Sequence, residues 1–324
     1  MATIVSDRPK LANVNSLEEL YEITGRMALT PGWISRPSPI LKLEINSKYP
    51  PAHWPYRDAH DALAAAGRLI GVELAERRNL LLFNDAGDND WATSRTLVCA
   101  YQMILPGEFA PSHRHTGNAL RVIVEGEGTY SIVDGERTPM ETGDVVLTPG
   151  GCWHGHGHDG DVPAYWLDCL DVPMSYLLER MRFTPPVGKE QPDARKVESN
   201  PYRFSRAEIS RLLDAAVPDT EGRFGQAAEL PTPSMPSIGL LAQRIEGGMT
   251  TRRRRTAANR LFAVMEGRGT TLVGDKTMTW ERGDTLFIPN GAWFEHSAES
   301  DAQLLDMSDE PVMRFTNHYG EELA

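Results

Sequence analysis

The sequence predicts a mainly β protein built from two similar barrels, and two observations support this prediction. From about Leu80 onward, short runs alternate with a period of two and are separated by Pro-Gly, Glu-Gly and Asp-Gly turns, which is typical of the strands of a sandwich or barrel. The chain also repeats itself, since segment 113–128 is similar to segment 253–269 and segment 142–154 is similar to segment 282–294. Self-similarity at this scale indicates a duplicated structural unit.

Strand patterning is clearest in the first copy of the repeat. It breaks off in a charged passage, 175–216, which we expect to be helical, and it resumes at Ile238. The predicted strands of the first copy cover residues 96–105, 121–124, 130–133 and 144–148.

Two helices are expected before the strands. Ser16, followed by acidic and then apolar residues, predicts a capped helix of about ten residues that ends near Met27. Residues 56–70 carry apolar side chains at helical spacing and are rich in Ala, which favours a second helix. The Pro-rich passage 31–55 between them predicts an extended arm. Such arms often clasp a neighbouring subunit, so we expect a homo-oligomer.

These patterns divide the chain into four parts. The predicted parts are N-terminal helices and arm at 1–79, a metal-binding barrel at 80–185, a helical or irregular connector at 186–235, and a second barrel without metal at 236–324.

Composition excludes several classes of function. The 324 residues have a formal net charge of -12, which argues against a nucleic-acid partner because phosphate binding needs a surplus of Lys and Arg. The basic run Arg252 to Arg255 is more readily explained by solvation or by pairing with carboxylates. Only three cysteines occur, at positions 99, 152 and 169, which indicates a reducing compartment. With no apolar stretch of about 18 residues, we expect a cytoplasmic protein outside the membrane.

Histidines cluster in the first copy of the repeat. Five of the nine in the chain fall between positions 113 and 158. Residues two apart in a strand face the same side, so His113 and His115 point to one place, and His154 reaches the same interior from another strand. Three neutral imidazoles bind a first-row metal and leave positions open for exogenous ligands. The alternative for His113 and His115 is an ordinary polar strand. It does not explain why a third histidine, His154, is expected at the same place.

The histidines lie in two motifs that resemble those of the cupin superfamily. They read Gly107-x5-His113-x-His115 and Gly143-x5-Pro149-x-Gly151-x2-His154. Many cupins place a glutamate ligand between the two motifs, where this chain has Ala119. The missing fourth ligand implies an additional open position on the metal, which suits a chelating substrate together with O₂.

Several segments around these motifs resemble gentisate 1,2-dioxygenase and its relatives that act on salicylate, 5-nitrosalicylate and 1-hydroxy-2-naphthoate. The resembling segments include 54–57, 74–78, 101–107, 133–138 and 166–168. The resemblance implies a bicupin with one Fe(II) per chain, an O₂ co-substrate, and a homotetramer. It also implies cleavage of an aromatic ring between the carboxyl-bearing carbon and the adjacent hydroxylated carbon.

Three further residues are expected to line the cavity because they alternate with the same face as the triad. Arg121 is the candidate for binding the substrate carboxylate, since a planar guanidinium matches that group. Gln102 and His156 are also expected to face the cavity, because side chains alternate along their strands. Both match family positions near the substrate, and His156 could carry a proton. A surface arginine and a satisfied core histidine are the alternatives for Arg121 and His156.

A second group of residues is expected to contact or support the substrate. Asp168 resembles a family acid that would hold Arg121 or a ligand histidine in place. Arg77 or Arg78 is expected to reach the substrate carboxylate, with a solvated edge as the alternative. Ala100 shares the face of Gln102, and its methyl group narrows the pocket, which favours gentisate-like substrates over salicylate. His158 and Cys152 are interpreted as structural.

The second copy is expected to hold no metal. Its residues at the positions of the triad are taken as Arg253, Arg255 and Phe294, and neither arginine nor phenylalanine is a metal ligand in proteins. His296 alone cannot rebuild a site.

The sequence thus predicts a ring-cleaving Fe(II) dioxygenase that acts on a 5-substituted 2-hydroxybenzoate, either gentisate or 5-nitrosalicylate. Salicylate or 1-hydroxy-2-naphthoate is the alternative substrate within the same family. A bicupin isomerase or decarboxylase would normally need the missing glutamate. A non-catalytic small-molecule-binding bicupin is the alternative from another class.

Overall fold

The computed structural model describes residues 11–35, 47–71, 78–186, 194–196 and 201–324. The chain forms two compact units, Met1–Glu44 and Ile45–Ala324. The first contains helix α2 (Leu17–Arg26), which begins where the backbone N–H of Glu19 donates to the Ser16 hydroxyl at 3.2 Å. The predicted first helix is therefore confirmed. In the same unit, the Trp33 indole donates a hydrogen bond to the Tyr21 hydroxyl.

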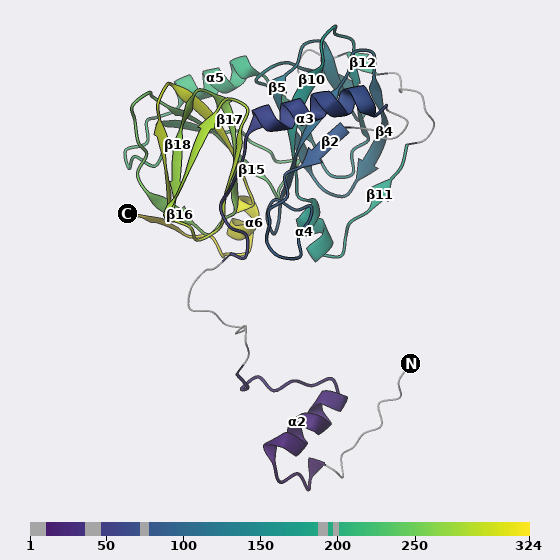
Figure 1. Ribbon diagram of the computed structural model, residues 1–324, viewed down its shortest axis with the longest axis vertical. Coiled ribbons are helices and arrows are strands. Elements are labelled where there is room, and N and C mark those ends of the chain that lie inside the picture. The colour runs from purple at the N-terminus through teal and green to yellow at the C-terminus, as the bar shows by residue number, and fades with distance from the viewer. Residues whose placement is uncertain (1–10, 36–46, 72–77, 187–193, 197–200) are drawn as a thin grey trace. The chain divides into compact units, whose positions relative to one another are not determined.

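The second unit contains two barrels, teal and yellow-green in Figure 1. In the described part of the chain, the N-terminal barrel has two six-stranded sheets, ordered β13-β8-β5-β10-β3-β2 and β11-β4-β9-β6-β7-β12. Its strands are β2 (Arg78–Leu81), β3 (Val98–Ile104), β4 (Phe109–His115), β5 (Ala119–Glu125), β6 (Thr129–Val133), β7 (Glu136–Met140), β8 (Val145–Thr148), β9 (His154–His158), β10 (Ala164–Leu170), β11 (Phe183–Thr184), β12 (Arg195–Lys196) and β13 (Arg203–Phe204).

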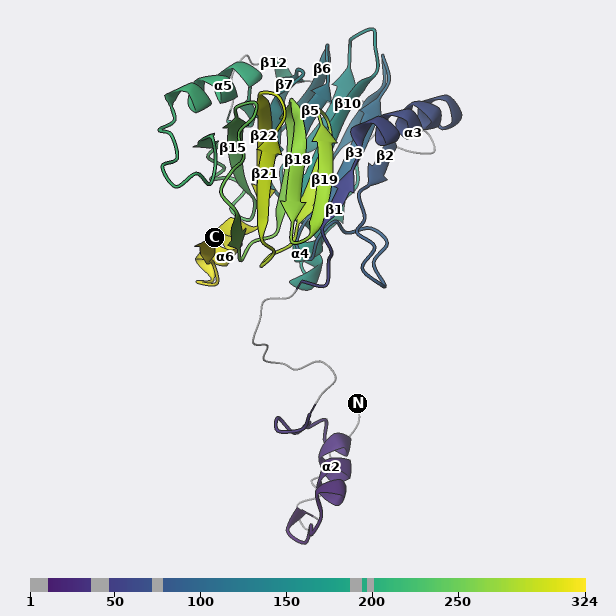
Figure 2. The ribbon, with the colours of Figure 1, turned by 60° about the vertical axis from the view of Figure 1, so that its left-hand side comes forward.

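The C-terminal barrel repeats this arrangement. Its sheets are ordered β1-β20-β17-β22-β15-β14 and β19-β18-β21-β16-β23, and Figure 2 shows the second of these from the front. Its strands are β1 (Ala52–Trp54), β14 (Gln226–Glu229), β15 (Gly239–Ile245), β16 (Arg254–Thr256), β17 (Arg260–Glu266), β18 (Arg268–Val273), β19 (Lys276–Glu281), β20 (Thr285–Ile288), β21 (Phe294–Ala298), β22 (Ala302–Ser308) and β23 (Glu321–Leu323).

Four helices of the described chain belong to this second unit. They are α3 (Tyr56–Leu69), α4 (Val172–Leu177), α5 (Arg206–Ala215) and α6 (Glu310–Phe315). Helix α3 confirms the second predicted helix and packs on β2 and β3 (Figure 1). None of the described helices has the length and apolar character needed to cross a membrane.

The structure corrects the helical interpretation of residues 175–216. Helix α4 ends at Leu177, and β11, β12 and β13 form short strands before α5 begins. Pro185 and Pro186 follow β11 directly, and proline prevents helix formation there because it disfavours the helical conformation of the preceding residue and has no N–H to donate.

The arm and the connector contribute strands to both barrels. Residues 36–46 lie outside the described residues, but β1, at the end of the Pro-rich passage, pairs with β20 of the same chain. His53 in β1 forms a 2.8 Å contact with Asp284. From the connector, β13 joins β8 of the N-terminal barrel and β14 joins β15 of the C-terminal barrel. Strands from the predicted arm and connector are therefore part of the sheets of the two barrels.

One of three hydrophobic core clusters in the described part of the chain includes residues of both barrels. It contains the outward-facing residues of both, such as Val122 and Leu167 of the first and Leu261 and Met307 of the second. The alternate residues of the same strands face inward, and Ile123 and Trp166 belong to a separate cluster inside the N-terminal barrel. This alternation decides which side chains can reach a site within each barrel.

Candidate active site

Two neighbouring strands bring the three predicted ligand histidines together. His113 and His115 lie on β4 and His154 begins β9, and His113 is the direct cross-strand partner of His154. Their ligand atoms all lie within 4.8 Å of one another, and no other group of this kind occurs among the residues that the structure describes. His113 and His154 are buried and His115 is half-buried. The spacing of two in β4 therefore places both imidazoles on the inner face, as predicted.

Hydrogen bonds fix the orientation of all three rings. The Nδ1 atoms of His113, His115 and His154 lie 3.2, 2.8 and 3.1 Å from the backbone carbonyls of Pro111, Gly117 and Cys152. A carbonyl accepts only, so each Nδ1 carries the proton and each Nε2 keeps a lone pair for a metal.

The surroundings of His154 also fit a metal ligand. Burial, together with the positive charge of Arg121, holds the pKa of His154 well below its usual range, so the ring stays neutral at physiological pH. Its Nε2 is buried and has no hydrogen-bond partner among the described residues. A metal ion held together with His113 and His115 would satisfy this lone pair.

Arg121 lies inside the same barrel, on β5. Its Nη1 donates to the Thr148 hydroxyl at 2.6 Å, and its Nε lies 3.3 Å from Asp168 Oδ1. Arg121 and Asp168 are also cross-strand partners. Two neighbours thus fix the guanidinium, which is buried near the triad.

Gln102, Ala100 and His156 complete the inner face. Gln102 and Ala100 alternate along β3, where they pair with Trp166 and Asp168 of β10. His156 lies two residues after His154, with its ring centroid 6.1 Å from that of His154 and its Nδ1 2.9 Å from the Ser131 hydroxyl.

Arg78 lies on the other face of the sheet. Its backbone partner on β3 is Met103, whose side chain belongs to the outer core. The guanidinium forms a bidentate ion pair with the carboxylate of Glu108, with N–O distances of 2.7 and 2.8 Å. It also donates a hydrogen bond to the carbonyl of Ile70 at 2.7 Å. This placement does not bring Arg78 to the triad. Arg77 lies outside the described residues.

His158, at the far end of β9, is structural as interpreted from the sequence. The N–H of Gly160 donates to its Nδ1, and its Nε2 donates to the carbonyl of Val162. Both ring nitrogens are therefore engaged by the fold.

Sequence reasoning missed several neighbours of the site. Phe183 on β11 pairs with His115, and its ring centroid lies 5.4 Å from that of His113. Thr148 and Ser131 hold Arg121 and His156. Both occupy the inward parity of their strands, so the alternation that identified Arg121 could also have identified them. No sequence signal marks Phe183, because the passage that contains it was expected to be helical.

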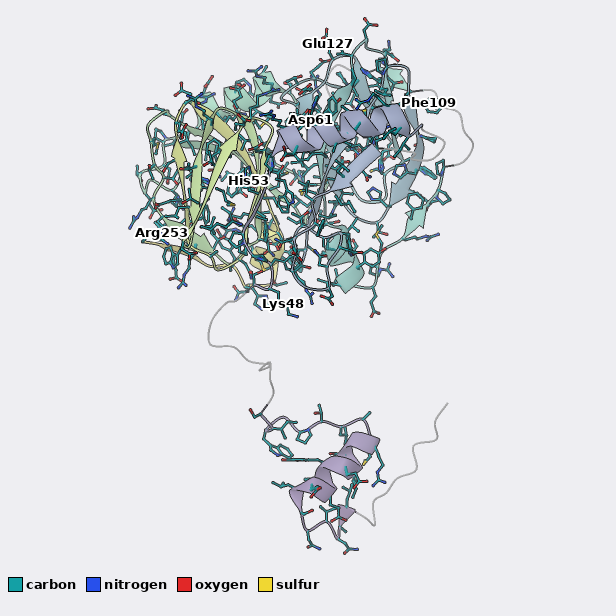
Figure 3. All side chains as sticks on the ribbon, in the orientation of Figure 1. Lys48, His53, Asp61, Phe109, Glu127 and Arg253 are labelled. Carbon is teal, nitrogen blue, oxygen red and sulfur yellow. The ribbon has the colours of Figure 1, made fainter. Side chains whose placement is uncertain are left out.

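The C-terminal barrel contains no comparable ligand set among its described residues. Of the three predicted counterparts of the triad, Phe294 was correct, whereas Arg253 and Arg255 were each wrong by one residue. Phe294 pairs with Arg254 just as His154 pairs with His113, so Arg254 and Thr256 are the counterparts of His113 and His115. Arg254 is buried, whereas Arg253 lies at the outer edge of the barrel (Figure 3). The alternation of side chains makes a shift of one residue exchange the two faces.

Two consecutive barrels of this kind in one chain define a bicupin. The family model described as "Cupin domain" matches residues 100–170 and 243–308, one segment in each barrel.

Comparison with known proteins narrows this class. The chain is 32% identical to gentisate 1,2-dioxygenase 1 of Aquipseudomonas alcaligenes, covering 93% of this chain and 94% of that protein. It is also 32% identical to 5-aminosalicylate 1,2-dioxygenase of a Comamonas species, covering 94% and 90% of the two chains. The structure of salicylate 1,2-dioxygenase from Pseudoaminobacter salicylatoxidans, solved as an adduct with gentisate, superposes with a TM-score of 0.84 at 25% identity, over 96% of this chain and 94% of that one.

The chain belongs to the gentisate 1,2-dioxygenase-like family of bicupins, and it is an aromatic ring-cleaving 1,2-dioxygenase. The family resemblance and the bicupin fold predicted from the sequence are both confirmed.

Proposed function

We propose that the enzyme uses Fe(II) and O₂ to cleave a 5-substituted 2-hydroxybenzoate between the carboxyl-bearing and hydroxyl-bearing carbons, with gentisate as the preferred substrate. The observation that supports this most strongly is the pairing of an open three-histidine site with a buried arginine inside one barrel. This combination suits a small aromatic anion that chelates through its carboxylate and its neighbouring hydroxyl.

The donor set fits Fe(II). Three neutral imidazoles leave the remaining coordination positions to exogenous ligands, and Ala119 supplies no fourth protein ligand. Bound Fe(II) would supply a redox-active Lewis acid that brings the aromatic substrate and O₂ together. The protein holds one such ion per chain in this proposal, at His113, His115 and His154.

Arg121 provides the positive charge that an anionic substrate requires. Its side chain is 2% exposed, so it would bind a carboxylate in a poorly solvated setting where charge-assisted hydrogen bonds are strong. Asp168 and Thr148 hold the guanidinium in one orientation. Arg121 therefore binds and orients the substrate carboxylate, and Asp168 acts by positioning Arg121.

His156 and Gln102 supply polar groups to the same cavity. His156 shares the inward parity of His154 on β9, and the contact of its Nδ1 with Ser131 fixes the ring. We assign His156 to the ring hydroxyl of the substrate, because an imidazole can either donate to that oxygen or accept from it. Gln102, on the opposite sheet, can bind a substrate oxygen in the same way.

The preference for gentisate has two supports. The relatives that cover more than nine-tenths of this chain at 32% identity are named for gentisate and 5-aminosalicylate, both of which carry a polar substituent at ring position 5. A relative named for 5-nitrosalicylic acid matches only 29% of this chain. Ala100 pairs with Asp168 on the inner face, and we propose that its methyl group narrows the substrate site in favour of gentisate.

Salicylate is the second candidate, because the superposed structures are those of a salicylate 1,2-dioxygenase. We also propose that the enzyme is a homo-oligomer, with a tetramer as the expected form. Arg77 stays a candidate for contact with the substrate carboxylate.

Oxygen uptake tests the proposed reaction. Protein reconstituted with Fe(II) under anaerobic conditions is mixed with air-saturated gentisate, 5-nitrosalicylate, salicylate or 1-hydroxy-2-naphthoate in an oxygen electrode. We expect one O₂ to be consumed per gentisate, with a new ring-fission absorbance and the highest kcat/KM in the panel. A higher kcat/KM for salicylate would overturn the preference, and the absence of uptake with all four would overturn the reaction.

A further inference from the structure

The interior of the C-terminal barrel carries polar residues at the positions that surround the metal site in the other barrel. Gln243 pairs with Leu304 as Gln102 pairs with Trp166, and Asp306 pairs with Phe262 as Asp168 pairs with Arg121. In the same way, His296 corresponds to His156 and pairs with Thr271 as His156 pairs with Ser131. Where His113 would stand, the barrel has Arg254.

Arg254 places a fixed positive charge inside this barrel. Its Nη1 donates to Glu321 at 2.8 Å, and its guanidinium lies 4.9 Å from the ring centroid of Phe294, the counterpart of His154. Burial, together with the charge of Arg254, lowers the pKa of His296 to about 3. The ring centroid of Phe294, which the guanidinium contacts, lies 5.5 Å from that of His296, so Arg254 and His296 both lie beside the position that corresponds to His154.

The buried charges around this point are balanced. Arg260 donates to Asp306 Oδ2 at 2.5 Å and also to Glu310, while Arg254 is paired with Glu321. No surplus of positive charge is left to attract an anion, and the two arginines exclude a metal cation.

Four side chains nevertheless keep polar atoms without partners. Within the described parts of the chain, these buried atoms are Gln243 Oε1, Gln243 Nε2, Arg254 Nη2, His296 Nε2 and Asp306 Oδ1. Gln243, Arg254, His296 and Asp306 are each at most 2% exposed. Leaving so many hydrogen-bonding groups unpaired in one interior would be costly, and buried polar atoms in native proteins nearly always have a partner.

The unpartnered atoms include both donors and acceptors. Arg254 Nη2 and Gln243 Nε2 donate, and Asp306 Oδ1 and Gln243 Oε1 accept. The Thr271 hydroxyl accepts from the Trp280 indole and lies 2.7 Å from His296 Nδ1. If Thr271 gives its own proton to that nitrogen, then the ring proton of His296 is on Nε2, which is a third donor. A ligand that serves this set must be small, neutral, and able both to donate and to accept.

We propose that the interior of the C-terminal barrel is a closed hydration site, in which ordered water bridges Gln243, Arg254, His296 and Asp306 in the place that corresponds to the metal site of the first barrel. Water is the smallest ligand with two donors and two acceptors, and buried water is commonly held by about three polar partners. Arg254 supplies the positive charge, and water supplies the remaining hydrogen bonds.

A high-resolution crystal structure of the full chain, grown in sodium bromide, tests the proposal directly. We expect at least one electron-density peak within hydrogen-bonding distance of two or more of the four side chains, with no anomalous bromide signal. An anomalous peak among them would replace water with an anion and overturn the proposal. An interior without density would overturn it as well.

The variant Gln243→Met provides a test in solution, because Met has nearly the volume of Gln but neither donates nor accepts in the same way. If water bridges Gln243, the substitution breaks the network, and Tm falls by about 2 °C or more. If the interior is dry, it removes two unpaired polar atoms, and Tm rises. Gln102→Met, at the matching position of the first barrel, is the control for the effect of replacing Gln by Met. The decrease in Tm for Gln243→Met must exceed the change in Tm for Gln102→Met.

Discussion

The two barrels share strand order and register, yet they fill the same inward positions with different chemistry. One presents His113, His115 and His154 to its interior, while the other presents Arg254, Thr256 and Phe294. In the first barrel the Nδ1 atoms of the three imidazoles lie within hydrogen-bonding distance of backbone carbonyls. In the second, the arginine is paired with a carboxylate and packed on an aromatic ring. The comparison shows that the same frame can present either a set of metal ligands or a cationic side chain.

The largest effect is expected from His154→Ala. Removing one of three ligands should abolish stable metal binding and lower kcat/KM by on the order of 10³-fold or more, since a catalytic metal contributes several kcal/mol. Metal analysis and oxygen uptake measure the two effects. Arg253→Ala, in the second barrel, is the control and should leave both unchanged. A His154→Ala protein that kept its metal and its activity would contradict the assignment of the site.

Arg254→Met should affect the fold and leave the metal content unchanged. It removes a buried charge and leaves Glu321, which is partly solvated and keeps Arg223, with one partner fewer, so the loss of this charge-assisted hydrogen bond should cost roughly 2–3 kcal/mol. Urea denaturation measures the loss, and metal analysis of the folded protein checks the active site. Arg255→Met is the matched control, because Arg255 pairs with Glu322 at the surface, where an ion pair contributes at most about 1 kcal/mol. Equal losses for both variants would contradict the idea that Arg254 replaces a cation inside the barrel.

Arg121→Met should lower the affinity for the substrate while the metal stays bound. The loss of a charge-assisted contact with a carboxylate is worth roughly 2–3 kcal/mol, or about 10²-fold in kcat/KM. Oxygen uptake at varied gentisate concentration gives kcat and KM, and calorimetry under anaerobic conditions gives binding. Arg121→Lys should recover part of the loss. An unchanged affinity for gentisate in Arg121→Met would show that the carboxylate is bound elsewhere.

The smallest effect is expected from Arg78→Met. Because its guanidinium is engaged by Glu108 and Ile70, the substitution should lower stability by about 1–2 kcal/mol, as Glu108 stays partly solvated. KM for gentisate should not change. A clear rise of KM without loss of stability would instead restore the substrate contact that the sequence suggested for Arg78.

The sequence predicted what depends on periodicity and spacing. A spacing of two placed His113 and His115 on one face, and a capping serine marked the start of α2. The alternation of strand residues also placed Arg121 and Asp168 on the inner face, where the two form an ion pair.

Features that depend on register and on distant segments could not be predicted in this way. The repeat aligns equally well with a slip of one residue, and only the pairing of Arg254 with Phe294 shows which arginine faces inward. Phe183 reaches the triad from a two-residue strand, which is too short to carry a period. The ion pair of Arg78 with Glu108 joins residues 30 positions apart in the sequence, and no local sequence pattern predicts it.

The central claim is that the chain holds one catalytic metal, in the N-terminal barrel. The most direct test is the iron content per chain, by elemental analysis, after anaerobic reconstitution with excess Fe(II) and removal of unbound metal. The account predicts one iron per chain. Two irons per chain would contradict the assignment of the second barrel as metal-free, and none would contradict the three-histidine site itself.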